Sequence, residues 1–316
     1  RRGRIGCRFE PVELSPLQTR TLGLLRRRPD PGVFDTAFVE SLVHDVTEAF
    51  AEFRERLDGG ELFISKHKVA SVLGCEVQHL LPDTFSWSPA VAGGQIAHRA
   101  VQLLVNWRGT PVPADLVDEA IARLTDADSS LGTWLAGSGD ADLADLRGFA
   151  IDKVIKFQEC FPPLDPRAAP TTESAVRWPA VGSIILSGKV DLAIGRPAGA
   201  ESRKVIIDLK TGWASPQHLQ DLRFYALVET LRTRIPPRKL ASFYLDAGEP
   251  VVEDVSEGLL LAATRRTLDA VDAEIRLRIE GHEPVKRPGR SCRWCPLSSD
   301  CAEGQSYLRG EDDADR

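Results

Sequence analysis

Asp191, Asp208 and Lys210 are the residues of this chain whose types and spacing best suit chemistry. They lie in two apolar segments, GKVDLAI and KVIIDLK, which we predict to be neighbouring strands because glycines and a proline mark a turn between them. If Gly195 and Lys204 close that turn, Asp191 faces Asp208, and facing side chains have Cβ atoms about 4.5–5.5 Å apart. Period-two alternation places Lys210 on the same face as Asp208.

Two carboxylates and an ammonium group on one patch of an apolar sheet predict a cation site. Adjacent buried carboxylates repel each other and are costly to desolvate, so they require a cation or a shared proton. Oxygen ligands suit a hard ion such as Mg²⁺ or Mn²⁺. The alternative is a surface hairpin whose Asp and Lys side chains face water, because the D-x-K pattern is common.

The constellation resembles the PD-(D/E)xK nuclease superfamily and, within it, the RecB-like branch. That branch has Gly-x-x-Asp on one strand and Asp-x-Lys on the next, as in Gly188 to Asp191 and Asp208 to Lys210. A helical histidine of the branch corresponds to His98, in the pattern GQIAH. The resemblance implies an α/β fold with a restriction-endonuclease-like core, in which helices flank a mixed sheet.

The same resemblance implies metal-dependent hydrolysis of the phosphodiester bonds of DNA, with single-stranded or frayed ends favoured. Lys210 would orient the attacking water and offset charge in the transition state. One or two Mg²⁺ or Mn²⁺ ions would be held by His98, Asp191, Asp208 and the backbone carbonyl of Leu209.

The apolar segment that follows Lys210 is predicted to be a helix beginning at Ser215-Pro216. Tyr225 matches the tyrosine of the Gln-x-x-x-Tyr pattern of RecB-like enzymes, but Asp221 stands at the glutamine position. Arg223 is a candidate phosphate contact, and an ion pair with Asp221 or Glu229 is the alternative.

A cysteine triplet near the C-terminus is the second strong signal: Cys292, Cys295 and Cys301 lie within one short segment. Three thiols are one short of a tetrahedral site, and Cys75 is the candidate fourth ligand. A disulfide is disfavoured in a cytoplasmic chain, and the spacing alone leaves zinc and an iron–sulfur cluster open. The resemblance extends to AddB and to the RecB-like exonucleases of CRISPR systems, and it implies a [4Fe–4S] cluster.

Basic residues surround this triplet without an intervening acid: Lys286, Arg287, Arg290 and Arg293. They form the candidate phosphate-binding strip for DNA. Trp294 is expected either to pack against the cluster or to stack on an unpaired base. The two remaining cysteines, Cys7 and Cys160, are expected to be free thiols.

The composition limits the classes of function. A chain of 316 residues can bury a sizeable core. A formal charge of −6 argues against binding of polyanions over the whole surface, so a nucleic-acid role must rest on local basic patches. No apolar run approaches a membrane span and no signal peptide precedes Pro11, so we expect a cytoplasmic protein without a membrane partner.

Hydrophobic periodicity divides the chain into three parts. We expect a helical N-terminal region at 1–60, a nuclease core at 61–281 with a helical insertion at about 113–165, and a cysteine-rich cap with an acidic tail at 282–316. Helices are predicted from Ser15-Pro16, over 35–57, over 65–81, from Gly93-Gly94 and over 256–279, with a strand hairpin over 239–255. Glu173 is expected at a strand start, either solvated or as an outer carboxylate.

Two other hypotheses fit the same residues. One is an iron–sulfur DNA-binding module with weak or no turnover, acting with a helicase or recombination partner in repair, recombination, CRISPR adaptation or phage defence. The other is a scaffold held together by zinc, in which the D-x-K pattern has no catalytic role. DNA cleavage that depends on Mn²⁺ separates the enzyme from both.

Overall fold

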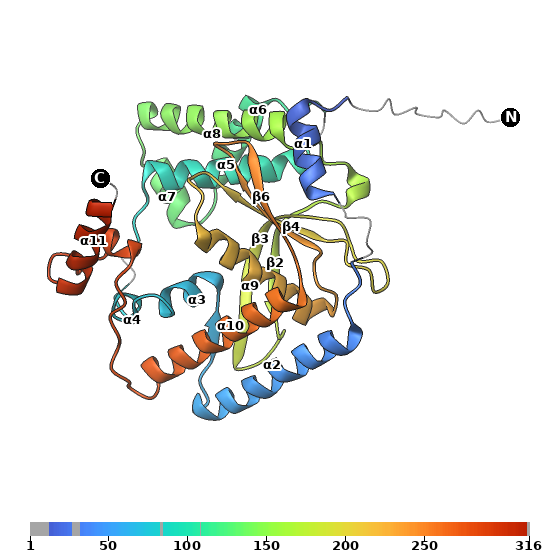
Figure 1. The fold of residues 1–316 in the computed structure, drawn as a ribbon. Helices are drawn as coiled ribbons and strands as arrows, with labels where there is room; N and C mark the ends of the chain where they lie inside the picture. The colour runs from blue at the N-terminus through green and yellow to red at the C-terminus, as the bar shows by residue number, and fades with distance from the viewer. Residues whose placement is uncertain (1–12, 27–31, 83–84, 108, 315–316) are drawn as a thin grey trace.

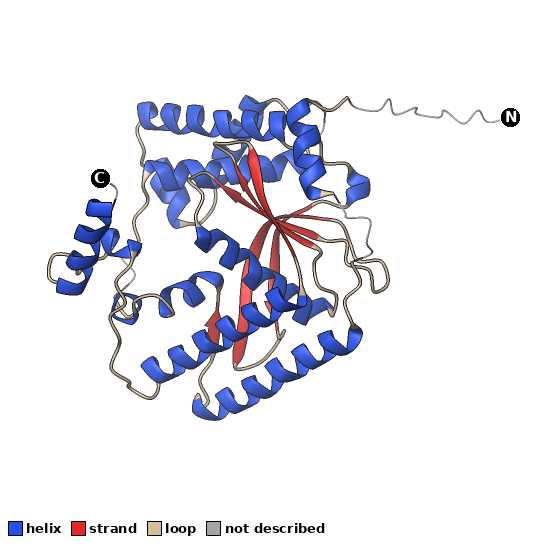
Figure 2. Ribbon diagram, in the orientation of Figure 1, coloured by secondary structure: helices blue, strands red, loops and turns tan. Residues whose placement is uncertain are grey.

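The computed structural model describes residues 13–26, 32–82, 85–107 and 109–314, and within them a six-stranded mixed sheet is covered by helices on both faces (Figure 1; Figure 2). The strands are β1 (Leu62–Ile64), β2 (Thr171–Trp178), β3 (Ile184–Ile194), β4 (Val205–Lys210), β5 (Lys239–Tyr244) and β6 (Glu249–Asp254). The α-helices are α1 (Pro16–Leu25), α2 (Thr36–Arg56), α3 (Lys66–Val72), α4 (Glu76–His79), α5 (Pro89–Val105), α6 (Pro113–Thr125), α7 (Ser130–Ala136), α8 (Asp140–Cys160), α9 (Pro216–Thr233), α10 (Glu257–Arg278) and α11 (Ala302–Ala314). Two 3₁₀ turns are η1 (Pro166–Ala168) and η2 (Arg290–Trp294). The predicted α/β class is confirmed.

β3 is the strand around which the sheet is built, because it pairs with three other strands. β2 runs antiparallel along one edge of β3, from residue 186 to residue 193. A strand has only two edges, so the other edge is shared between β1, parallel at 184–186, and β4, antiparallel at 192–194. The stretch 187–191 of β3 therefore faces a gap between β1 and β4.

The predicted register of the β3–β4 hairpin is confirmed. Ile194 pairs with Val205, so Gly195 and Lys204 close the turn as expected. Gly195 has a φ of +88°, and a Cβ there would lie 2.6 Å from the carbonyl oxygen of Arg203. Glycine is the residue that meets both constraints, so the turn that fixes the register depends on it.

Two helical layers enclose the sheet. α5, α6 and α8 cover one side and α2, α9 and α10 the other (Figure 1). On β4, Ile207 packs under the first layer and Ile206 under the second. Alternation therefore places Asp208 and Lys210 on the side of Ile206. The block at 113–165, predicted to be an insertion, supplies α6 to α8 and thus contributes to the core over the sheet.

Several predicted boundaries differ from the structure. The helix expected over 65–81 is divided into α3 and α4, and Cys75 is the N-cap of α4. α5 begins at Pro89, after the cap Ser88, so Gly93 and Gly94 lie inside the helix. The expected acidic tail contains α11. The predicted starts of α1 and α9 and both predicted ends of α2 and α10 agree with the structure to within a residue or two.

Candidate active site

Three carboxylates lie side by side on three neighbouring strands. Asp208 on β4 faces Asp191 on β3, one position beyond the last pair of the β3–β4 ladder. Glu173 on β2 faces Asp191 from the other edge, between two paired positions of the β2–β3 ladder. The backbone of Glu173 has a φ of 51°, which residues other than glycine rarely adopt. Such strained residues cluster at functional sites.

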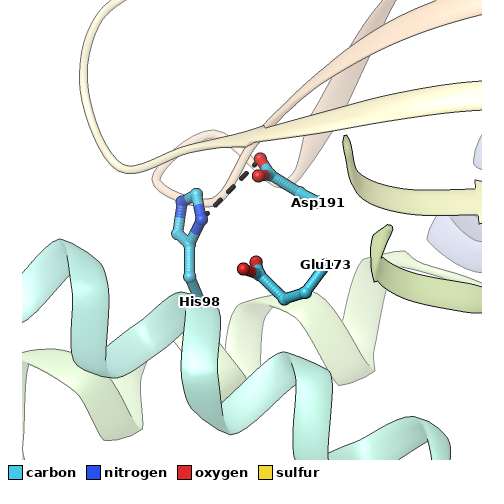
Figure 3. A group of neighbouring side chains, drawn as sticks. All are labelled: His98, Glu173 and Asp191. Carbon is cyan, nitrogen blue, oxygen red and sulfur yellow. Dashed lines mark ion pairs between the residues drawn. The ribbon is translucent and has the colours of Figure 1, made fainter. Parts of the chain in front are cut away.

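His98 on α5 points toward Glu173 and Asp191 (Figure 3). Within the described ranges, these three residues are the only group of three or more His, Cys, Asp or Glu whose ligand atoms all lie within 4.8 Å of one another. Nδ1 of His98 is 3.7 Å from Oδ2 of Asp191, and this oxygen accepts a 2.8 Å hydrogen bond from the N–H of Leu209. Two carboxylates and an imidazole suit a divalent cation, with Mn²⁺ accepting both donor types.

Asp208 contacts two lysines and is not a member of that group. Its Oδ2 lies 2.7 Å from Nζ of Lys210, and its Oδ1 accepts a 3.0 Å hydrogen bond from Nζ of Lys66. Only 2% of Asp208 is exposed, so its charge is balanced inside the protein. The structure therefore groups Glu173, and not Asp208, with His98 and Asp191 as residues whose ligand atoms lie within 4.8 Å of one another.

Lys66 at the start of α3 is a site residue that sequence reasoning missed. Its ammonium group also lies 3.8 Å from Oδ2 of Asp221 and 5.1 Å from the ring centre of Tyr225, a cation–π distance. Burial alone would lower the pKa of Lys66, but the charge of Asp208 and its neighbours raises it above the ordinary value. No local pattern marks Lys66, because its position depends on the pairing of the three-residue strand β1 with β3.

The two facing aspartates have opposite electrostatic environments. Burial raises the pKa of Asp191, and the negative charge of Asp208 acts in the same direction. Burial would also raise the pKa of Asp208, but the ammonium groups of Lys66 and Lys210 outweigh it and lower that pKa. The two lysines therefore already stabilise Asp208 as a carboxylate, whereas Asp191 would be stabilised in its charged form by an additional cation.

α9 borders the site with Asp221 and Tyr225, one helical turn apart. Asp221, at the position of the family glutamine, accepts a 3.0 Å hydrogen bond from Nε2 of Gln217 and faces Lys66. Tyr225 is buried against Gly188, where a Cβ would lie 2.5 Å from Cε1 of the ring. This close approach is a physical reason for glycine in the Gly-x-x-Asp pattern.

The cysteines predicted to act together line one cavity, which α4, η2 and α11 enclose: Cys75, Cys292, Cys295 and Cys301. The sulfur of Cys292 accepts a hydrogen bond from the N–H of Gly289, and that of Cys301 from the N–H of Gly304, each at 3.4 Å. Hydrogen bonds to sulfur are among the features that tune metal–thiolate centres. Cys160, the last residue of α8, lies apart from them in the core, and Cys7 lies outside the described residues.

The C-terminal segment is also held to α4 by hydrogen bonds. The N–H of Glu76 donates to the carbonyl of Val285 at 3.1 Å, and the N–H of Val285 donates to Oε2 of Glu76 at 2.8 Å. Arg287 donates to Oε1 of the same glutamate at 2.9 Å. Residues 285–287 are therefore docked independently of the cysteines.

Most basic residues proposed as phosphate contacts take part in interactions within the chain. Arg223 pairs with Glu253 of β6, and not with Asp221 or Glu229. Lys286 pairs with Glu303, and Arg287 with Glu76. Arg290, Arg293 and Trp294 lie in η2, where the indole of Trp294 is 77% exposed.

Comparisons with known proteins agree with this geometry. Residues 64–302 match the family model described as the PD-(D/E)XK nuclease superfamily. Among solved structures, a protein from Eubacterium rectale titled "Putative exonuclease" is 11% identical, with a TM-score of 0.43 over 77% of this chain and 87% of that one. A structure titled SSO0001 is 15% identical, with a TM-score of 0.31 over 83% of this chain and 95% of that one. No curated protein sequence matched.

The family match spans most of the chain and includes His98, Glu173, Asp191, Asp208 and Lys210. The chain belongs to the PD-(D/E)XK nuclease superfamily. The low TM-scores add nothing to this assignment, which rests on the family model. Of the helices in the described ranges, none is both long and apolar enough to cross a membrane.

Proposed function

We propose that this protein is a RecB-like, divalent-metal-dependent deoxyribonuclease that acts on single-stranded or frayed DNA. The observation that carries the proposal is the convergence of His98, Glu173 and Asp191 within 4.8 Å, on the scaffold of a nuclease family. Lys210 follows on the adjacent strand, with its ammonium group 2.7 Å from Asp208. A bound cation beside a lysine can stabilise the negative charge that develops during phosphodiester hydrolysis.

The residues fit Mg²⁺ or Mn²⁺. Asp191 and Glu173 provide hard oxygen donors, and His98 adds a nitrogen that Mn²⁺ accepts more readily than Mg²⁺. Asp208 and the carbonyl of Leu209 complete the ligand set that we propose from the family resemblance. A divalent ion bound there would polarise the scissile phosphate and lower the pKa of a coordinated water.

The protein's own groups would orient the reactants and balance charge. Asp208 fixes the ammonium groups of Lys66 and Lys210 on the side of the sheet where the phosphate would lie. Positive groups held in place before the reaction stabilise developing negative charge without reorganisation. We assign Lys210 to the attacking water and Lys66 to the placement of Asp208, with Tyr225 and Asp221 holding Lys66.

We further propose that Cys75, Cys292, Cys295 and Cys301 hold a [4Fe–4S] cluster. The four thiols line one cavity, and it is the family resemblance, not the spacing, that favours the cluster over zinc. Bound there, the cluster would fasten the C-terminal segment to the junction of α3 and α4.

A nuclease assay on anaerobically purified protein tests the proposal. Single-stranded, blunt and frayed duplex DNA of defined ends are incubated with Mn²⁺, with Mg²⁺ and with chelator. Cleavage that requires the metal and is faster on unpaired ends supports the enzyme. DNA binding that ignores metal, without cleavage, would reject it in favour of a binding module.

A further inference from the structure

Trp213 presents an indole ring to solvent beside the candidate active site. The residue is 95% exposed, the most exposed of the large apolar side chains in the described part of the chain. Tryptophan can bury about 150–250 Å² when it packs, and it is highly buried on average. An indole exposed next to the candidate active site is not used in the core and is available to stack on a ligand.

Trp213 lies close in the chain to Lys210, the candidate catalytic lysine. It is three residues beyond Lys210, the last residue of β4, in the connection to α9. Three residues span at most about 11 Å between Cα atoms, so Trp213 is within reach of the strand that Lys210 would act on.

The connection that carries Trp213 is fixed at both ends. Thr211 packs on α5 where a Cβ on Gly94 would lie 3.0 Å from its Oγ1, one helical turn before His98. At the other end, the side chain of Ser215 accepts a 3.3 Å hydrogen bond from the N–H of Gln217 and caps α9. Residues 212–214 are the exposed ones between these anchors. The indole therefore projects from a short turn whose two ends are fixed on α5 and α9.

We propose that Trp213 is a stacking platform for one unpaired nucleobase of the DNA strand, next to the scissile phosphate. This inference rests on the proposed nuclease function and deepens it. Stacking on an aromatic ring accepts any base, because every base has a π-face. A base held in a duplex already has both faces covered, so the platform favours an unpaired strand. Selectivity for strand state would then come from Trp213 rather than from the metal ligands.

Three substitutions separate stacking from other roles of the side chain. Trp213→Phe keeps an aromatic face, Trp213→Leu keeps apolar bulk without one, and Trp213→Ala removes both. We expect the Ala and Leu variants to lose about 5- to 150-fold in kcat/KM on single-stranded DNA, the fold-change that matches the loss of one stacked base. The Phe variant should retain most of the activity. Val181→Ala removes another exposed apolar side chain, 88% exposed in the β2–β3 turn, and should change nothing.

A second measurement locates the base. A single abasic site is moved along the single-stranded substrate, and kcat/KM is measured for wild-type protein and Trp213→Ala. The wild type should be slowed by an abasic site at one position near the cut. The Ala variant should not be slowed further there, because the partner of that base is already absent.

The outcomes distinguish this inference from the function on which it rests. If the wild type cleaves DNA but Trp213→Ala and Trp213→Leu keep kcat/KM within about twofold, the platform is rejected and the nuclease stands. The platform is equally rejected if the abasic penalty persists in the Ala variant. If the wild type cleaves nothing, the proposed function fails, and the same variants in a single-strand binding assay decide whether Trp213 stacks on a base.

Discussion

Glu173 faces Asp191 at the one position between Thr171 and Trp178 where the β2–β3 ladder is interrupted. The strained backbone of Glu173 accompanies the turn of its carboxylate toward His98 (Figure 3). Carboxylates that would repel each other are thus kept close by the sheet itself, which prepares the position for a cation.

Glu173→Gln should weaken Mn²⁺ binding by about 10- to 100-fold, the loss typical when one supporting group of a metal site is removed. Calorimetric titration with Mn²⁺ measures the change. Lys189→Gln is the companion variant: Lys189 pairs with Glu173 and competes with a metal ion for its carboxylate, so this change should not weaken Mn²⁺ binding. Unchanged affinity in Glu173→Gln would remove Glu173 from the site.

Asp191→Asn and Asp208→Asn should both abolish cleavage but have opposite effects on the stability of the metal-free protein. Asp208→Asn leaves two lysines without their shared carboxylate and should lower the free energy of unfolding by about 3 kcal/mol. Asp191→Asn removes a buried carboxylate that burial disfavours and should raise Tm. Repulsion between the two aspartates alone would predict that loss of Asp208 stabilises the protein, and the contacts with Lys66 and Lys210 reverse that sign.

The pH dependence of stability, measured in the presence of a chelator, tests the same two aspartates. The pKa of Asp208 is lowered on folding, so its stabilising effect is present above the ordinary value of 3.8 and is lost as pH falls through the lowered pKa. The pKa of Asp191 is raised, so its carboxylate reduces stability as pH rises from 3.8 through the raised pKa. The gain from Asp191→Asn should therefore be larger at about pH 7 than at about pH 3, measured by denaturant unfolding. A gain that shrinks as pH rises contradicts the assignment.

Lys66→Met should reduce kcat without loss of Mn²⁺ affinity, because Lys66 positions Asp208 and donates no ligand. It leaves Asp221 buried without its cation, so stability should also fall. Adding Asp221→Asn should restore part of that stability, with a coupling of about 0.5–3 kcal/mol in the double-mutant cycle. Strict additivity of the two changes would show that the pair does not interact.

Gly188→Ala should destabilise the fold by about 1–3 kcal/mol and lower activity, because the new methyl group would overlap the ring of Tyr225. Gly148→Ala in α8 is the control, since a Cβ there meets no atom within 4 Å. That variant should gain up to about 1 kcal/mol from helix propensity. Equal stability of the two variants, measured by thermal unfolding, would argue against the close approach.

Cys75→Ala should lose most bound iron, and Cys160→Ala should lose none, because Cys160 is remote from the cysteine cavity. Trypsin should then cleave the Cys75 variant after Arg290 and Arg293. Residues 285–287 should stay docked, because Glu76 holds them independently. Full iron content in Cys75→Ala would exclude Cys75 as a ligand.

The parts of the site that the sequence predicts are those encoded by short-range patterns. The turn closed by Gly195 fixes the register of β3 and β4, and alternation then fixes the relation of Asp191 to Asp208 and Lys210. The helix that carries His98 is predicted by the periodicity of its apolar residues. Cys75 was inferred to join the C-terminal triplet because three thiols are one short of a ligand set, and the resemblance supported this, but no local pattern could have shown that they converge.

The residues that sequence reasoning missed depend on non-local pairing. Lys66 reaches Asp208 only because β1, a strand of three residues, pairs with β3 more than a hundred positions later. Glu173 turns inward through a backbone conformation that its residue type disfavours. Arg223 finds Glu253 on β6, a partner that helical spacing does not suggest.

The short helix α3 connects the candidate active site to the cysteine cavity. Lys66 stands at its first position, and Cys75 follows three residues after its last, so about 10 Å of helix separates the contact with Asp208 from the cysteine cavity. An oxidant that stripped the thiols of their proposed cluster would loosen this helix at one end and displace Lys66 at the other. If the protein is the nuclease proposed above, damage of that kind would stop cleavage before the protein unfolded.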